Sequence, residues 1–237
     1  MKAFLTYLFF FGVFRLPLFA TADIQSVRAT GSGTTCVMAV SATGSGNLLV
    51  FGVDSLGGSN FTITAAATGA GTMTLCAASA CHLFAGTSAY NIDSGYVLSA
   101  TGGVTSLTAT VSGTPSGTWN CWVKEISHTG VVTYDTAGTR GPISCASPCA
   151  GVALTLGGSN DIIVQLCDGG PNCTAVTSPY SSNVTFSGGE GYASSLNTNS
   201  GTAPNWTTTS GPGNMILNAI AFKETLTHCA SCDMSGL

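Results

Sequence analysis

Short apolar runs of strand length alternate with clusters of glycine, serine, asparagine and proline along almost the whole chain. The clusters include Gly57-Gly58, Pro115-Ser116-Gly117 and Gly211-Pro212-Gly213, which are residue types that favour tight turns. After the first 22 residues, no segment has the 3.6-residue apolar periodicity of an amphipathic helix. The sequence therefore predicts an all-β fold built as an antiparallel β-sandwich. The expected strands are residues 35–41, 47–53, 61–67, 72–77, 96–100, 106–112, 118–127, 150–155, 161–167, 183–186 and 214–224.

Two parts of the chain repeat the same order of features, which indicates an internal duplication. Asn47–Val50 and Asn160–Val164 are similar apolar runs, and each leads into an acidic turn rich in glycine and asparagine that begins at Asp54 or Asp168. Two similar halves favour a jelly-roll-like sandwich. Chance similarity between two glycine- and serine-rich β segments is the alternative. Each half closes on a long apolar strand that ends in Lys-Glu, at residues 119–125 and 215–224.

Four strand segments resemble a loose group of secreted bacterial β-sandwich proteins, which occur alone or as modules of large surface proteins. The resemblance rests on Asn47–Val53, Trp122–Ser127, Asn160–Val164 and Ala219–Lys223. It covers most of the chain after residue 22, although its motifs are strand patterns and the many cysteines depart from that group. The resemblance implies a jelly-roll-like fold and a role at the cell surface, and it transfers no catalytic residue.

The N-terminal segment has the three parts of a secretory signal peptide. Lys2 supplies a positive charge, residues 3–14 form an almost unbroken apolar run, and Ala20-Thr21-Ala22 is a cleavage sequence of the A-x-A type. The apolar run is shorter than the roughly 20 residues that cross a bilayer. A transmembrane anchor, with Arg15 close behind the apolar run, is the alternative.

We expect three parts in the chain: a signal peptide at 1–22, one β-sandwich domain at 23–225 and a cysteine-containing tail at 226–237. The chain has 6 basic and 10 acidic residues, and charged residues make up only 7% of it, whereas ordinary soluble proteins contain ~25%. Nucleic-acid binding requires clustered lysine and arginine, so the composition excludes that class of partner. No membrane span is expected after residue 22, because no second apolar run is long enough.

All ten cysteines follow the expected cleavage site, and an even number of them is typical of an exported, disulfide-bonded protein. Most lie in close pairs along the chain, which leaves Cys36 and Cys121 for a long-range bond. This pairing rests on proximity, because a sequence alone does not determine connectivity. The expected disulfides are Cys36–Cys121, Cys76–Cys81, Cys145–Cys149, Cys167–Cys173 and Cys229–Cys232.

Two acidic turns are candidate metal sites. Asp54 and Asp168 each lie near asparagine and backbone carbonyl oxygens, which suit calcium. An Asx-turn, in which the carboxylate accepts a hydrogen bond from the local backbone, is the alternative for each. The C-x-x-C of Cys229 and Cys232 follows His228, and a disulfide, a redox pair or part of a zinc site fits that spacing. The sequence contains no cofactor motif, so no cofactor is expected.

Four aromatic residues are candidate sugar-binding residues, because β-sandwich lectins bind glycans through exposed rings near loops. Trp206 lies in a polar stretch, where we expect an exposed side chain, and Tyr134, Tyr180 and Tyr192 border expected turns. The alternative is that these rings cover the edges of the sandwich, since tyrosine and tryptophan tolerate one end in water.

Nothing in the sequence identifies an enzyme. The acidic residues are scattered singly, and no G-x-S-x-G motif is present. We therefore expect a secreted or cell-surface protein without catalytic residues, which acts in structure or interaction with itself or with other surface proteins. Few charged residues protect the strand edges against pairing, which favours self-association. A carbohydrate-binding module with glycans as partners and an extracellular hydrolase with a pair of carboxylates brought together by folding are the alternatives.

Overall fold

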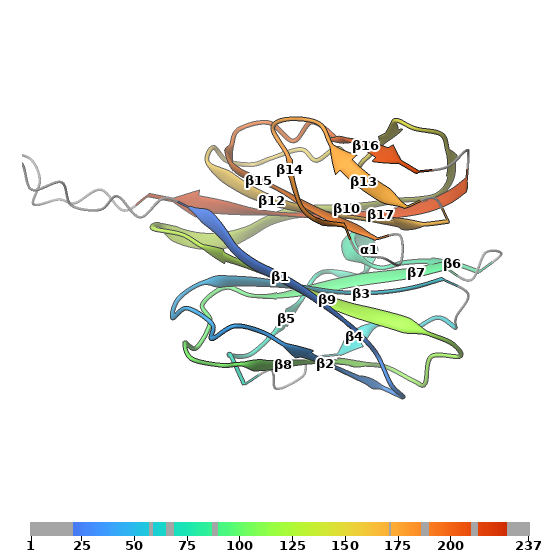
Figure 1. The fold of residues 1–237 in the computed structure, drawn as a ribbon. Helices are drawn as coiled ribbons and strands as arrows, with labels where there is room; N and C mark the ends of the chain where they lie inside the picture. The colour runs from blue at the N-terminus through green and yellow to red at the C-terminus, as the bar shows by residue number, and fades with distance from the viewer. Residues whose placement is uncertain are drawn as a thin grey trace, which may run out of the picture.

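The chain forms four antiparallel sheets stacked on one another (Figure 1). The computed structural model describes residues 21–56, 59–64, 69–86, 90–170, 172–185, 190–209 and 213–226. Within these residues the one helix is α1 (Ala78–Cys81). The predicted all-β antiparallel sandwich is confirmed. In chain order the strands are β1 (Ala22–Thr30), β2 (Thr35–Ala39), β3 (Leu48–Leu56), β4 (Ile63–Thr64), β5 (Thr74–Leu75), β6 (Leu83–Ala85), β7 (Tyr90–Val97), β8 (Ser106–Val111), β9 (Trp119–Ser127), β10 (Val131–Cys145), β11 (Cys149–Ala150), β12 (Asp161–Gly169), β13 (Cys173–Val176), β14 (Ser181–Thr185), β15 (Gly191–Thr198), β16 (Asn205–Thr208) and β17 (Gly213–Thr225).

The two halves of the chain have the same strand order. In the first half the inner sheet runs β1-β9-β3-β7, with β5 and β6 added to β7, and the outer sheet runs β2-β8-β4. In the second half the inner sheet runs β10-β17-β12-β15-β14, and the outer sheet runs β11-β16-β13. Strands β1 to β4 and β7 to β9 therefore correspond one by one to β10 to β13 and β15 to β17. The sequence predicted one sandwich from two similar halves; each half forms a jelly-roll-like sandwich of its own.

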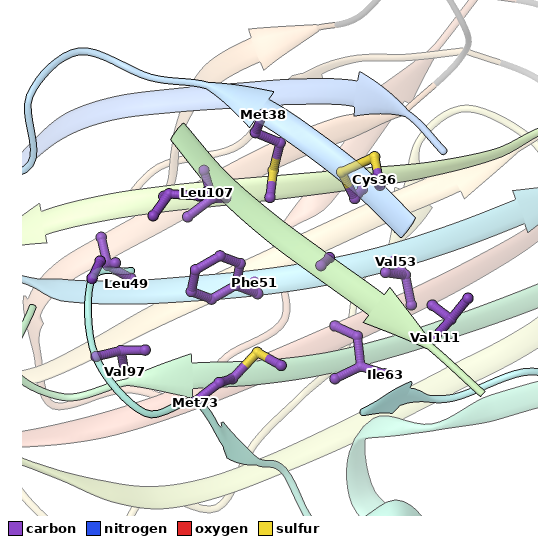
Figure 2. Close-up of a cluster of buried hydrophobic side chains, with 14 of the residues drawn as sticks. Cys36, Met38, Leu49, Phe51, Val53, Ile63, Met73, Val97, Leu107 and Val111 are labelled. Carbon is purple, nitrogen blue, oxygen red and sulfur yellow. A yellow bond between two sulfur atoms is a disulfide. The ribbon is translucent and has the colours of Figure 1, made fainter. Parts of the chain in front are cut away.

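The inner strands are apolar on both faces because both faces are covered. On β3, Leu49, Phe51 and Val53 face the outer sheet of their own half, where Met38 and Leu107 cover them (Figure 2). The alternate residues of β3 face the inner sheet of the other half. Three cores result: one inside each sandwich and a central one between them.

The central layer joins the halves through polar contacts as well as apolar ones. Lys124 is fully buried there, with its Nζ 2.9 Å from Oδ1 of Asp23, and Ser194 of the other half donates a hydrogen bond to the same carboxylate. The Ser94 hydroxyl similarly donates to the amide oxygen of Asn218, across the layer. Because buried polar groups normally have hydrogen-bond partners, these contacts help to set how one sandwich sits on the other.

Four of the five expected disulfides are confirmed: Cys36–Cys121, Cys76–Cys81, Cys145–Cys149 and Cys167–Cys173. Cys229 and Cys232 lie outside the described residues, as does nearly all of the expected tail. Residues 1–20 of the expected signal peptide also lie outside them, while Thr21 and Ala22 are described and Ala22 pairs with Ser127. None of the described residues belongs to a helix long and apolar enough to span a membrane.

Candidate functional site

Two acidic residues from opposite halves of the chain meet in the central layer. Asp54 lies on β3 and Asp168 on β12, which are corresponding strands of the two halves. Side chains at even spacings along a strand share one face. Residues at even spacings before Asp54 on β3 and before Asp168 on β12 belong to the central core, so both acids point into the central layer. The sequence placed both in separate turns. That prediction is wrong, because both lie within strands and face one another across the layer.

A third acid completes a cluster. Glu190 immediately precedes β15, and one carboxylate oxygen from each of Asp54, Asp168 and Glu190 lies within 4.8 Å of the others. Asp54 and Asp168 are 0% exposed, and Glu190 is 2% exposed. We call Asp54, Asp168 and Glu190 the central acid cluster. Asp54 belongs to the first half and lies more than a hundred residues before Asp168 and Glu190 of the second half, so the complete cluster exists only because the two sandwiches stack.

Two side chains of the first half donate hydrogen bonds into the central acid cluster. Arg28 of β1 donates to Oε1 of Glu190 at 2.6 Å, and its own side chain is 19% exposed. The Asn120 amide of β9 donates to the same oxygen at 2.8 Å and to Oδ1 of Asp54 at 3.2 Å. These bonds leave Oδ2 of Asp54 and Oε2 of Glu190 without a hydrogen-bond partner, and neither carboxylate oxygen of Asp168 accepts a hydrogen bond of normal geometry.

Burial and mutual repulsion make the central acid cluster difficult to ionise. Burial raises the pKa of Asp168 to about 7, and the charge of Glu190 adds to the shift, while the Gly169 backbone and Arg28 oppose it. Burial also raises the pKa of Asp54 well above its usual value, with further contributions from Asp168 and Glu190. Carboxylates that share a site cannot all carry charge without a compensating cation or proton.

Two aromatic rings border the central acid cluster. Burial raises the pKa of the Tyr192 hydroxyl well above its usual value, and the charges of the three acids raise it further. The Tyr192 ring packs against Trp122, with ring centroids 4.5 Å apart. Trp122 fits against β3 only because residue 52 is glycine, since a Cβ at Gly52 would lie 1.8 Å from the indole. The rings exclude water from one side of the cluster, which strengthens electrostatic interactions within it.

The predicted sugar-binding aromatics do not form an exposed platform. Trp206 was expected in an exposed position, but it lies on β16 and is 0% exposed in the core of the second sandwich. Tyr180 is also buried in that core, and Tyr192 is buried beside the central acid cluster. Tyr134 is half-buried and stacks on Tyr96, with ring centroids 5.7 Å apart. Rings in these positions stabilise the fold, because their faces are covered by protein.

Two other buried acids, Glu224 and Glu125, have ordinary structural partners. Glu224 accepts hydrogen bonds from the backbone amides of Thr129 and Gly130 and from the Thr21 hydroxyl. Glu125 likewise accepts from the backbone of Gly44 and from two side-chain amides. These carboxylates hold turns against strand ends. They differ in this respect from the central acid cluster, where most of the carboxylate oxygens lack donors.

The arrangement of the central acid cluster suits the binding of a cation or the sharing of protons. Hydrolysis of an extended substrate requires carboxylates that a substrate can reach, and exposure of 0–2% prevents that. The sequence identified two of the three acids but placed them in two separate sites. It gave no reason to associate Glu190 with them, although a register comparison of the repeated strands would have paired Asp54 with Asp168.

Comparisons with protein-family models, curated proteins and solved structures find no match for this chain.

Proposed function

We propose that this chain is an exported structural or interaction protein of the cell exterior, without enzymatic activity. The observation that carries the proposal is the burial of the side chains best suited to chemistry. The three members of the central acid cluster are at most 2% exposed, and Trp206 is 0% exposed. A substrate or glycan would have to enter a closed core to reach them, so the molecule is left with its outer surface for function.

The outer face of the first sandwich offers an uncharged surface for pairing. β2 is an edge strand, and its outward residues are Thr35, Val37 and Ala39, of which Val37 is 58% exposed. The neighbouring β8 turns Ser106 outward. Proteins usually protect exposed strand edges with charged residues, and an unprotected edge is a template for another strand. This edge is therefore the best candidate for contact with a second copy of the chain.

The compartment fits this role. Four disulfides among the described residues indicate an oxidising environment outside the cytoplasm. The resemblance of four strand segments to secreted bacterial surface proteins supports the same location. The alternatives are weaker: a carbohydrate-binding module lacks an exposed platform of the predicted rings, and a substrate of a hydrolase would have no access to the cluster of three acids found among the described residues.

Size-exclusion chromatography with light scattering on the secreted protein tests the proposal. We expect species larger than a monomer when the disulfides are intact, and the same species after mild reduction if strands rather than cysteines join the copies. The variant Val37→Lys places a charge on the β2 edge and should return the protein to a monomer. Thr207→Lys is the matched control, because Thr207 is exposed on the central strand of the other outer sheet.

A monodisperse monomer at high concentration would contradict self-association. Glycan-array binding that is lost on substitution of an exposed residue would favour the carbohydrate-binding alternative. Turnover of a polysaccharide or peptide would contradict the absence of enzymatic activity.

A further inference from the structure

We propose that Asp54, Asp168 and Glu190 bind one Ca²⁺ ion, which joins the two sandwiches. The proposal goes beyond the proposed function and does not depend on it, since a structural ion would serve any protein of this fold. It rests on the partners of the carboxylate oxygens, on the charge of the site and on the spacing of its oxygens.

Unpartnered oxygens are the first argument. Asp168 is 0% exposed, yet neither of its oxygens accepts a hydrogen bond of normal geometry, although the backbone of the adjacent Gly169 lies close enough to lower its pKa. One oxygen of Asp54 and one of Glu190 likewise have no hydrogen-bond partner. A buried carboxylate without donors costs several kcal/mol, and buried charges in proteins are normally paired or bound to metals. Glu224, by contrast, accepts two backbone amides at 2.8 and 2.9 Å.

An independent polar group is aimed at the same place. Asn120 is 8% exposed, and its amide reaches both Asp54 and Glu190, while its Oδ1 has no hydrogen-bond partner. Rotation of the amide by half a turn exchanges its oxygen and nitrogen, which occupy nearly the same volume. With an ion present, this rotation would present Oδ1 to the ion as a fourth protein ligand.

The charge of the site matches a divalent cation. Three ionised carboxylates and the one neighbouring guanidinium, Arg28, leave a net charge of −2. Arg28 lies on the Glu190 side, with Oε1 of Glu190 at 2.6 Å. The charge of Arg28 also acts on Asp54 and Asp168, but a single guanidinium offsets only one of the three carboxylates. A single doubly charged ion would neutralise the cluster without a large rearrangement of the protein.

The ligand type and the burial of the site favour Ca²⁺. All of the donors are oxygens, which hard cations prefer, and no cysteine or histidine belongs to the cluster. No two of these cluster oxygens lie more than 4.8 Å apart, which is compatible with one Ca²⁺ ion between them at Ca²⁺–oxygen distances of about 2.3–2.6 Å. Mg²⁺ gives up its water reluctantly and usually keeps several water ligands, whereas the three acids are at most 2% exposed, so the burial of the site favours Ca²⁺.

Calorimetric titration of the secreted protein, stripped with a chelator and with its disulfides intact, tests the proposal. CaCl₂ should bind with one ion per chain and a dissociation constant of about 10⁻³ M or tighter, the range of extracellular calcium sites. MgCl₂ should bind more weakly. The midpoint of thermal unfolding should rise with Ca²⁺, because the ion binds only the folded chain.

Three variants separate the site from the rest of the molecule. Asp54→Asn and Asp168→Asn should each weaken Ca²⁺ binding by at least about tenfold, while both variants still fold, since each removes a buried charge. Asp161→Asn is the matched control: Asp161 is another fully buried acid on β12, outside the cluster, and its loss should leave Ca²⁺ affinity unchanged.

Three results would overturn the proposal. The first is no heat of binding and no thermal shift with Ca²⁺ at about 10 mM, well above the range of extracellular sites; the acids would then hold protons in place of an ion. The second is Ca²⁺ binding that survives intact in Asp168→Asn. The third is binding of Mg²⁺ that is as tight as that of Ca²⁺ or tighter, which would show that the site is not specific for Ca²⁺.

Discussion

The two sandwiches share one strand order but close their cores by different means. In the first, the disulfide Cys36–Cys121 crosses the core from β2 to β9 and joins residues 85 apart in the sequence. In the second, Cys149 occupies the comparable place on β11 but is bonded to Cys145, four residues away. Opposite Cys36 lies the small Ala109, whereas opposite Cys149 lies Trp206. A long-range covalent bond across one core thus corresponds, in the other, to a large ring beside bonds between cysteines only four and six residues apart.

This difference separates two sources of stability within one fold. A long-range disulfide acts mainly by restricting the unfolded chain, so its effect grows with the length of the loop that it closes. A buried tryptophan acts through the folded state, by removing apolar surface from water and filling the core. The same architecture therefore accommodates either a long-range disulfide or a large buried ring at this position.

Removal of the long-range disulfide should have the largest effect. The double variant Cys36→Ala/Cys121→Ala should lower the free energy of unfolding by about 4.5 kcal/mol, because the unfolded chain regains the entropy of a loop of this length. The measurement is urea unfolding followed by tryptophan fluorescence. The variant replaces both cysteines, so no free thiol remains to form a new bond.

The second sandwich provides the matched control for that prediction. Cys145→Ala/Cys149→Ala removes a bond between residues only four apart, and its loss should cost about 2 kcal/mol. Equal losses in the two double variants would show that loop entropy does not determine the difference, and that local packing around each sulfur pair does.

Trp206→Ala should produce the next largest effect. The indole is 0% exposed and lies against β15, where a Cβ at Gly191 would come within 2.8 Å of the ring. Its loss should lower the free energy of unfolding by about 4 kcal/mol, measured by thermal or urea unfolding. Thr207→Ala, at the exposed neighbouring position, should change it by less than about 0.5 kcal/mol. A Trp206→Ala variant as stable as the wild type would contradict the comparison between ring and disulfide.

The sequence allowed the inner strands and the disulfides to be predicted. β3, β9, β12 and β17 are covered on both faces, so they appear as continuous apolar runs that stand out from the turns. The cysteine pairs of the second half lie within six residues of one another, and proximity was sufficient to assign them. The repeated order of Asn47–Val50 and Asn160–Val164 correctly indicated that β3 and β12 are equivalent.

Other strands and the central acid cluster could not be predicted, because tertiary contacts decide them. β1, β10 and β15 are rich in serine, threonine, glycine and alanine, and they have no apolar alternation that separates them from a loop. Trp206 seemed exposed because its neighbours are polar, yet those neighbours face outward from a strand that buries the ring. The distance between Asp54 and Asp168 depends on how two sandwiches stack, and a strand pattern contains no such information.

The smallest predicted effect concerns Asp161, where the halves differ by one charge. Asp161 precedes Asp168 by the same interval at which Asn47 precedes Asp54. Asn47 donates a hydrogen bond to Glu125, whereas neither oxygen of Asp161 accepts one, and Asp161 can hydrogen-bond to the neighbouring Asp135 carboxylate only while it holds a proton. Burial raises the pKa of Asp161 to about 6 and the charge of Asp135 adds to the shift, while Lys223 opposes it.

The sign of the resulting pH dependence follows from that raised pKa. Between the usual carboxyl value of 3.8 and about 6, the folded protein keeps a proton that the unfolded chain releases, so the free energy of unfolding falls as pH rises through this window and stays lower above it.

Asp161→Asn makes the second half resemble the first and should remove this loss. The variant should match the wild type near pH 3.5 and exceed it by about 1 kcal/mol at pH 7, a value reduced for solvent screening near the partly exposed Lys223. Urea unfolding at several pH values, with a chelator present to exclude bound cations, measures the difference. If the free energy of unfolding falls equally in the two proteins from pH 4 to 6, the charge of Asp161 does not cause the fall. The uncharged Asn47 of the first half would then give no more stability than Asp161 does.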